Sequence, residues 1–225
     1  MNKFIYLIIL LFISIESFSF AAKQDSTFFI GAWGGFSYSK IIGYSQETEM
    51  LVKPNYGISF TYYFHQEFYL KSGIGFLQNG FTTVHLYTDT TNDTIGNFKT
   101  FNEFSYFSIP FEINYNFGRK KFNPYLNFGV AVDFLSKQQT YADLPSEYNG
   151  TEVIPFKQYQ TDLYKTVNFN LVFGIGIEYR LKPYIVFFSD FKYHYGLSQI
   201  LKKSNTYIFK HRSLFTNIGI RFAIF

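Results

Sequence analysis

The chain has 225 residues, of which 23% are aromatic, with 31 Phe and 20 Tyr, and only 16% are charged. A soluble domain has about 25% charged residues, so this composition indicates that much of the protein surface does not face water. The net charge of +4 is too small, and its basic residues too dispersed, to indicate a nucleic-acid-binding protein. The absence of cysteine excludes disulfides and thiolate metal ligands, and it leaves the redox compartment open.

The N-terminus predicts export from the cytoplasm. Lys3 precedes the apolar run from Phe4 to Ile15, and "SFA" at Ser19 to Ala21 places small residues where a signal peptidase cleaves. A membrane anchor is the alternative, but the run is shorter than the roughly 20 residues of a spanning helix. We therefore expect a signal peptide at residues 1–21 and a single barrel domain at residues 22–225.

From Thr27 onward, apolar and polar residues alternate in eight segments rich in Phe, Tyr, Val and Ile. A period of two with these residue types is the main sequence signal of a β-strand. Each segment has about ten residues or more, the length of a transmembrane barrel strand, whereas ordinary strands have about 5–6. The strands are predicted near Phe28–Tyr38, Tyr56–His65, Phe68–Asn79, Tyr106–Phe117, Tyr125–Leu135, Val167–Arg180, Tyr184–Gly196 and Ser213–Ile224.

The predicted connections alternate between short turns and long polar loops. The long loops are Ser39–Asn55, Gly80–Ser105, Ser136–Thr166 and Leu197–Arg212. Short periplasmic turns and long outer loops are typical of bacterial outer-membrane barrels, and an even strand count places both termini at the short-turn end. The predicted fold class is all-β, an eight-stranded antiparallel up-and-down transmembrane β-barrel with a cleaved N-terminal signal peptide.

The composition of the two strand faces predicts which one meets lipid. The apolar face has no charged residue in any of the eight segments, and a Lys or Arg at the bilayer midplane of a barrel costs about 2–4 kcal/mol. A secreted lipocalin-like barrel is the alternative, with the apolar face turned inward. The polar face favours the membrane barrel, because small residues are useful in a narrow lumen. Its glycines are Gly31, Gly35, Gly57, Gly73, Gly75, Gly129, Gly174, Gly176 and Gly219.

The same polar face predicts a network of charges in the lumen, where charges must be paired. Four acids, Glu112, Asp133, Glu178 and Asp190, accompany four bases, Lys71, Arg180, Lys192 and Arg221. Asp190 and His194 are four residues apart on one strand, about 13 Å, so they cannot form a direct acid–base pair. We interpret the set as a charge-balanced filling rather than a catalytic site.

The remaining patterns predict no cofactor, no metal and no catalytic site. The four histidines lie on different elements, and neither a Gly-x-Ser-x-Gly elbow nor a phosphate loop is present. An eight-stranded lumen also leaves little room for a diffusion pore. Pro110 lies in a predicted strand and donates no hydrogen bond, so we expect a local bulge there.

Basic and aromatic residues gather near the ends of the predicted strands. Lys202, Lys203, Lys210 and Arg212 flank the last long loop and are predicted either to contact lipopolysaccharide phosphates or to be ordinary solvated residues. Arg119 to Lys121 form a predicted periplasmic turn beside lipid headgroups. The aromatic residues near the strand ends suit interfacial girdles; they include Tyr38, Tyr56, Phe104, Tyr164 and Tyr195.

Four stretches resemble the PorT-like outer-membrane β-barrel family. They are "YFSIPFEINYNFG" (Tyr106–Gly118), with the family's aromatic-x-Ile-Pro core, "PYLNFGVAVDFL" (Pro124–Leu135), "GIGIEYRL" (Gly174–Leu181) and "DFKYHYGLSQI" (Asp190–Ile200). The resemblance spans Thr27 to Phe225. It implies the barrel fold, an outer-membrane location and a reason to expect Pro110. The family's name-giving member works in type IX secretion, but most members have no assigned activity.

These observations predict a non-enzymatic integral outer-membrane protein. It would act through extracellular loops or as a membrane-assembly or secretion-associated component. The expected partners are outer-membrane lipid, lipopolysaccharide and secretion-system or surface proteins, with no nucleic acid. The alternatives are an outer-membrane enzyme of the lipid acyltransferase or protease type and the secreted lipocalin-like barrel.

Overall fold

The computed structural model describes residues 28–43, 48–88, 94–118, 121–143, 147–148, 151–152, 156–202 and 208–224. The predicted signal peptide at residues 1–21, the turn residues Arg119 and Lys120, and Lys203 lie outside these ranges.

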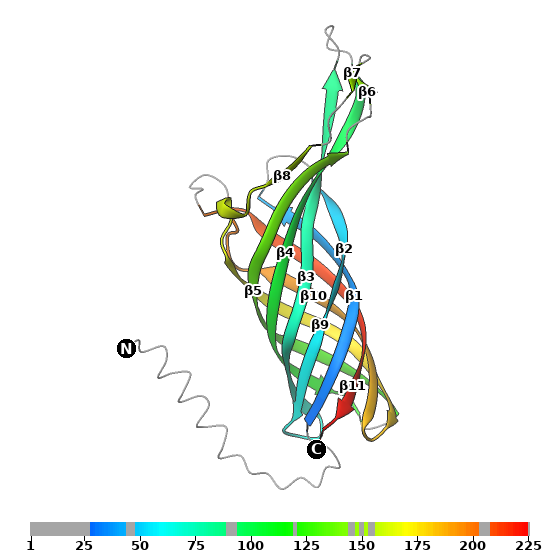
Figure 1. Cartoon of the computed structure of the whole chain (residues 1–225). Coiled ribbons are helices and arrows are strands. Elements are labelled where there is room, and N and C mark those ends of the chain that lie inside the picture. The colour runs from blue at the N-terminus through cyan, green and yellow to red at the C-terminus, as the bar shows by residue number, and fades with distance from the viewer. Residues whose placement is uncertain are drawn as a thin grey trace, which may run out of the picture.

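Eight long strands form one closed antiparallel barrel (Figure 1). They pair in chain order, β5 pairs with β9, and β1 pairs with β11, which closes the cylinder. The predicted eight-stranded up-and-down barrel is therefore confirmed. The strands are β1 (Phe28–Ile42), β2 (Thr48–Tyr63), β3 (Phe68–Thr88), β4 (Thr94–Asn116), β5 (Phe122–Asp143), β9 (Val167–Lys182), β10 (Ile185–Gly196) and β11 (Lys210–Ala223).

Shorter elements lie at the outer end, opposite the C-terminus (Figure 1). β6 (Glu147–Tyr148) pairs with β7 (Thr151–Glu152), and β8 (Lys157–Tyr159) adds to β5 at Gln139–Tyr141. A single turn of 3₁₀-helix, η1 (Thr161–Leu163), follows β8. No helix of the described residues is long and apolar enough to cross a membrane.

Three of the four predicted long loops were wrong in extent, because strands continue into them. β3 and β4 extend as a projecting hairpin through most of Gly80–Ser105, β5 continues to Asp143, and β1 and β2 occupy most of Ser39–Asn55 (Figure 1). The outer parts of these strands have polar residues on both faces, so the period-two signal is lost there. The register shift between Ser105 and Tyr106 adds to this, because it changes the phase of the pattern.

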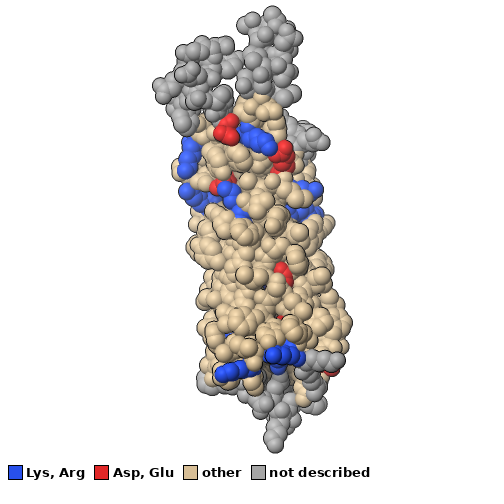
Figure 2. All heavy atoms as spheres, turned by 90° about the vertical axis from the view of Figure 1, so that its right-hand side faces the viewer, with Lys and Arg blue, Asp and Glu red and all other residues tan. Residues whose placement is uncertain are grey.

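The apolar face points outward along the whole cylinder. Phe111 is 54% exposed and Ile175 59%, whereas Glu178 and Arg221 on the other face are at most 1% exposed. Figure 2 shows the result on one side of the molecule: a broad band with few charged atoms, and Lys and Arg gathered above and below it. Such a band flanked by charge is the exterior of a membrane barrel, not of a lipocalin-like one.

Trp33 explains two of the lumen glycines. Its ring lies across β2 and β3, where a Cβ on Gly57 or on Gly75 would come within 2.8 Å of Trp33 Cζ2. At Gly35 an added Cβ would instead collide with the backbone carbonyl of Thr216 on β11. Glycine is required at these positions because a ring or a neighbouring strand approaches the backbone too closely for a side chain.

Pro110 is accommodated without the bulge that we predicted. The β3–β4 register is the same on both sides of it, with Ser72 opposite Phe111 and Gly75 opposite Ser108. The hydroxyl of Ser72 donates a 2.8 Å hydrogen bond to the carbonyl of Pro110. A side chain thus satisfies the carbonyl where the proline nitrogen cannot take part in the ladder, so no extra residue is needed.

Candidate functional site: the filled lumen and the outer rim

The lower lumen is built around a buried carboxylate. Glu178 forms an ion pair with Arg221 and accepts a 2.7 Å hydrogen bond from the hydroxyl of Tyr69. Arg221 also donates to Tyr63 Oη at 2.6 Å, and Arg180 approaches the same hydroxyl at 3.4 Å. These donors compensate the carboxylate for the water that it lost on burial.

A second ionic layer lies above the first. Lys192 Nζ is 2.7 and 2.8 Å from the two carboxylate oxygens of Glu112 and 3.6 Å from Asp190, and Lys71 is also 3.6 Å from Asp190. Asn217 donates a further 2.7 Å hydrogen bond to Asp190. Two acids and two bases therefore balance, and the Lys192–Glu112 pair joins β10 to β4 across the lumen.

Asp133 is the predicted charge that the structure leaves apart from the others. It is 3% exposed, and Asn170 Nδ2 donates a 2.7 Å hydrogen bond to it. No ion pair to Asp133 is formed by the described residues. A polar amide, not a cation, therefore holds this carboxylate.

Aromatic and aliphatic side chains close the outer end of the lumen, and we call this group the upper plug. Tyr164 and Ile200 come from the segments before β9 and β11, which are held together by a 2.7 Å hydrogen bond from the Lys165 amide to the Ile200 carbonyl. Phe104 and Tyr164 were predicted in the lipid-interface girdle, and their packing inside the plug corrects that. The plug consists of Ile41, Leu77, Phe81, Phe104, Tyr106, Leu135, Ile200 and Phe215, with Trp33, Tyr164 and Phe209 against it.

The cavity found in the described part of the lumen is small. The cavity among Lys71, Glu112, Asp190 and Lys192 measures about 30 Å³, far below the roughly 300–1,000 Å³ of a small-molecule site. His211 shares a 3.0 Å hydrogen bond with Tyr106, and the ring of His194 packs on Phe215 at 4.3 Å. Within the described ranges, no three His, Asp or Glu side chains lie close enough to hold a metal ion.

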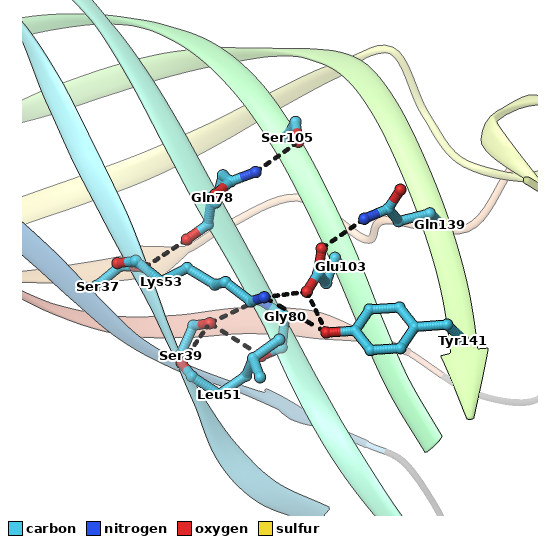
Figure 3. A network of polar contacts seen from close by, with 10 residues as sticks. All are labelled: Ser37, Ser39, Leu51, Lys53, Gln78, Gly80, Glu103, Ser105, Gln139 and Tyr141. Carbon is cyan, nitrogen blue, oxygen red and sulfur yellow. Dashed lines mark hydrogen bonds and ion pairs between the residues drawn. The ribbon is translucent and has the colours of Figure 1, made fainter. Parts of the chain in front are cut away.

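At the outer mouth, Glu103 joins three strands (Figure 3). It forms an ion pair with Lys53 of β2, and it accepts 2.6 Å hydrogen bonds from Tyr141 and Gln139 of β5. Glu103 lies beyond the lipid-facing wall. Two residues along β4, Ser105 is opposite Lys137 of β5 in the strand register, and the exposed charge of Lys137 marks the end of the hydrocarbon region. Burial alone would raise its pKa, but the hydrogen bonds from Lys53, Tyr141 and Gln139 outweigh burial, and the pKa of Glu103 is lowered.

Two serines of β1 beside this network form hydrogen bonds with backbone groups of β3 where the β2–β3 hydrogen-bond ladder is interrupted. The β2–β3 register shifts between Met50 and Asn55. There Ser39 of β1 takes over both backbone groups of Gly80: its hydroxyl accepts from the amide at 2.6 Å and donates to the carbonyl at 2.9 Å. Ser37 donates to the carbonyl of Gln78 in the same way (Figure 3). Sequence reasoning missed both the network and these serines, because nothing in the pattern locates a bulge.

The predicted phosphate-contacting residues lie at the outer rim, with different surroundings. Arg212 faces outward opposite Lys40, but its guanidinium stacks 3.5 Å from the ring centroid of Tyr195 and donates to the carbonyls of Gly196 and His211. Lys210 begins β11, and Lys202 is exposed. Two further lysines, Lys137 and Lys157, place their ammonium groups 4.8 and 5.7 Å from the ring centroid of Tyr159.

A closed barrel with a lipid-facing wall, a filled lumen and charged rims defines an integral outer-membrane β-barrel protein. The chain belongs to the family of outer membrane protein beta-barrel domains, whose model matches residues 20–202. It is accordingly a protein of the bacterial outer membrane.

Solved structures of similar fold share little sequence with the chain. Neisserial surface protein A is 15% identical, with 88% of this chain and 97% of that chain covered at a TM-score of 0.49. The attachment invasion locus protein Ail of Yersinia pestis is 12% identical (88% and 100% covered, TM-score 0.42), and the outer membrane protease OmpT of Escherichia coli is 7% identical (92% and 100%, TM-score 0.46). A comparison with curated proteins finds no significant match.

Proposed function

We propose that the protein is a non-enzymatic surface component whose outer extension binds an extracellular or secretion-associated partner. The observation that supports this is the filling of the lumen. Ion pairs across the cylinder and the upper plug leave the lumen unsuited to passage or to a substrate, whereas the β3–β4 hairpin and the outer part of β5 project beyond the lipid-facing wall.

A non-enzymatic role also agrees with the ionisable groups. The two described lumen histidines are engaged by Tyr106 and Phe215, and Glu103 at the mouth is saturated by three donors. A general base needs a substrate proton within hydrogen-bond reach. A secretion role of the PorT type is the narrower form of the proposal, with a protein of the secretion apparatus as the partner of the extension.

Photo-crosslinking in intact cells tests the proposal. A photoreactive amino acid at exposed Lys99 or Asp143 of the extension should yield protein adducts, whereas the same group at lipid-facing Phe111 should yield none. Absence of protein adducts at both outer positions, in cells where the barrel is folded, would contradict the proposal. Swelling of liposomes containing the protein in small sugars would contradict the closed lumen on which it rests.

We further propose that the outer rim contacts lipopolysaccharide phosphates through Lys40, Lys202 and Lys210. Arg212 contributes less, because its guanidinium is already engaged by Tyr195 and two carbonyls. Lys→Gln substitution at the three positions should weaken binding of purified protein to lipopolysaccharide but not to its dephosphorylated form. Equal binding of both forms by the unsubstituted protein would contradict the phosphate contact.

A further inference from the structure

The lipid-facing wall has a hollow near its periplasmic half. It is an open, shallow depression of about 600 Å³ and is almost entirely apolar. It exists because Ala32, Gly34 and Ser189 put small groups on the outer face between larger ones such as Phe187 and Ile218. A Cβ on Gly34 would meet no atom of the described residues closer than 3.8 Å, so none of them occupies the space beside it.

Strand register places the hollow within one membrane leaflet. Its lower edge is a row of neighbours, with Phe122 opposite Tyr179 and Tyr179 opposite Phe187, at the ends of the strands beside the periplasmic turns. Its upper edge is at Gly34, about six residues above the start of β1. With a rise of about 3.4 Å per residue and a tilt of about 45°, that is roughly 14 Å, or half of a bilayer's hydrocarbon core.

A cation lies at the periplasmic end of the hollow. Lys121 is exposed, and its ammonium lies 5.1 Å from the ring centroid of Tyr179, which lines the hollow. Lys182 lies 5.5 Å from the ring centroid of Tyr184 at the adjoining β9–β10 turn. The outward-facing described residues at this end of β5, β9, β10 and β11 include no carboxylate. An apolar slot ending at an ammonium is complementary to a molecule with an acyl chain and an anionic head.

We propose that this hollow is a binding site for a phospholipid of the periplasmic leaflet. One acyl chain fills the space over Gly34 and Ser189, and the phosphate binds Lys121, with Lys182 beside it. The phosphate distinguishes this site from general lipid contact. A second hollow of about 580 Å³ on the wall, between Ile113 and Leu214, has no Lys or Arg stacked on its described rings, and it serves as an internal comparison.

Native mass spectrometry of the full-length folded protein tests the site. The protein is equilibrated in micelles with phosphatidylglycerol and with diacylglycerol of the same chains, which lacks the phosphate. We expect selective retention of phosphatidylglycerol. Lys121→Gln should lower its retention about fivefold, the effect of one lysine near a membrane surface, without changing that of diacylglycerol. The matched control Lys137→Gln, at the outer end, should leave both unchanged.

Filling the hollow tests the acyl-chain part of the proposal. Gly34→Leu should reduce retention of the phospholipid, whereas Val130→Leu, which leaves a leucine of the same size on the wall outside the hollow, should not. Gly34→Ala provides a milder filling should the leucine variant not fold. Equal retention of the two lipids by the unsubstituted protein, unchanged retention in the Lys121 and Gly34 variants, or a dimer in place of bound lipid would each overturn the proposal.

Discussion

The strongest test of the lumen concerns the pair of Glu112 and Lys192. Glu112→Gln removes one of the two negative charges of the upper ionic layer and leaves Lys71 and Lys192 with Asp190 alone. Lys192→Met leaves Glu112 and Asp190 with Lys71 alone. Both residues are at most 7% exposed, so water cannot replace the lost partner.

The size of the effect follows from burial. Removing one partner of a buried ion pair costs about 3–5 kcal/mol of unfolding free energy, because the other charge stays buried without compensation. The double variant Glu112→Gln, Lys192→Met leaves the Lys71–Asp190 pair at 3.6 Å and no excess charge. Its loss should therefore be smaller than the sum of the single losses by about 1–3 kcal/mol.

Urea unfolding of the barrel in lipid vesicles, followed by the fluorescence of the single tryptophan, measures these differences. The control is the Lys99–Glu49 pair, which has a similar 2.7 Å distance but side chains 45% and 53% exposed. Its coupling should be below about 1 kcal/mol. If the losses of Glu112→Gln and Lys192→Met simply added in the double variant, the two side chains would not form the cross-lumen pair.

Three further outcomes are expected. Gly57→Val should destabilise the barrel by about 1–3 kcal/mol through overpacking, because its Cβ would come within 2.8 Å of the tryptophan ring. The control Gly34→Val, on the open outer face, should not destabilise it. Thermal unfolding in vesicles measures both variants, and equal shifts of the midpoint would contradict the overpacking argument. The carboxylate of Glu103 has a lowered pKa, so its stabilisation is present above the ordinary value of about 4.3 and is lost as the pH falls through the lowered one. The protection of amides in the outer part of β4, measured against their intrinsic exchange rate at each pH, should therefore fall at acidic pH in the unsubstituted protein, and a similar fall in Glu103→Gln would exclude that group as the cause. Ser72→Ala should cost about 1–3 kcal/mol by leaving the Pro110 carbonyl without its donor, and Ser72→Thr, which keeps the hydroxyl, should lose less in the same unfolding assay.

The sequence predicts the wall of this barrel well and its outer end poorly. Within the membrane one strand face contacts hydrocarbon and the other faces a packed lumen, so each residue must suit one of two different surroundings. Apolar residues such as Phe111 therefore alternate with lumen residues such as Glu112 along the whole spanning part of the strand. Above the wall, residues such as Thr82 and Asn102 can be polar on either face, and the pattern no longer marks a strand. The interfacial-girdle prediction for Phe104 failed for the same reason, because β4 continues past this residue, whereas Tyr164 lies in the segment before β9 that packs against the upper plug.

Ion-pair partners were beyond the reach of sequence periodicity. Lys71 and Glu112 are direct neighbours on β3 and β4, and yet the carboxylate of Glu112 binds Lys192 on the far wall. Which charge crosses the lumen depends on strand tilt, on the position of bulges and on side-chain length. Composition predicted that acids and bases share the lumen face, but it could not predict that Asp133 would bind an amide instead.

The orientation of the wall is tested most directly by accessibility along one strand. Since the chain has no cysteine, single cysteines can be introduced at successive positions from 107 to 115 of β4 and spin-labelled in vesicles. Labels at 107, 109, 111, 113 and 115 should collide with oxygen dissolved in the bilayer, and labels at the even positions between them should be shielded. The opposite phase, or access of a water-soluble relaxing agent to position 111, would contradict the account.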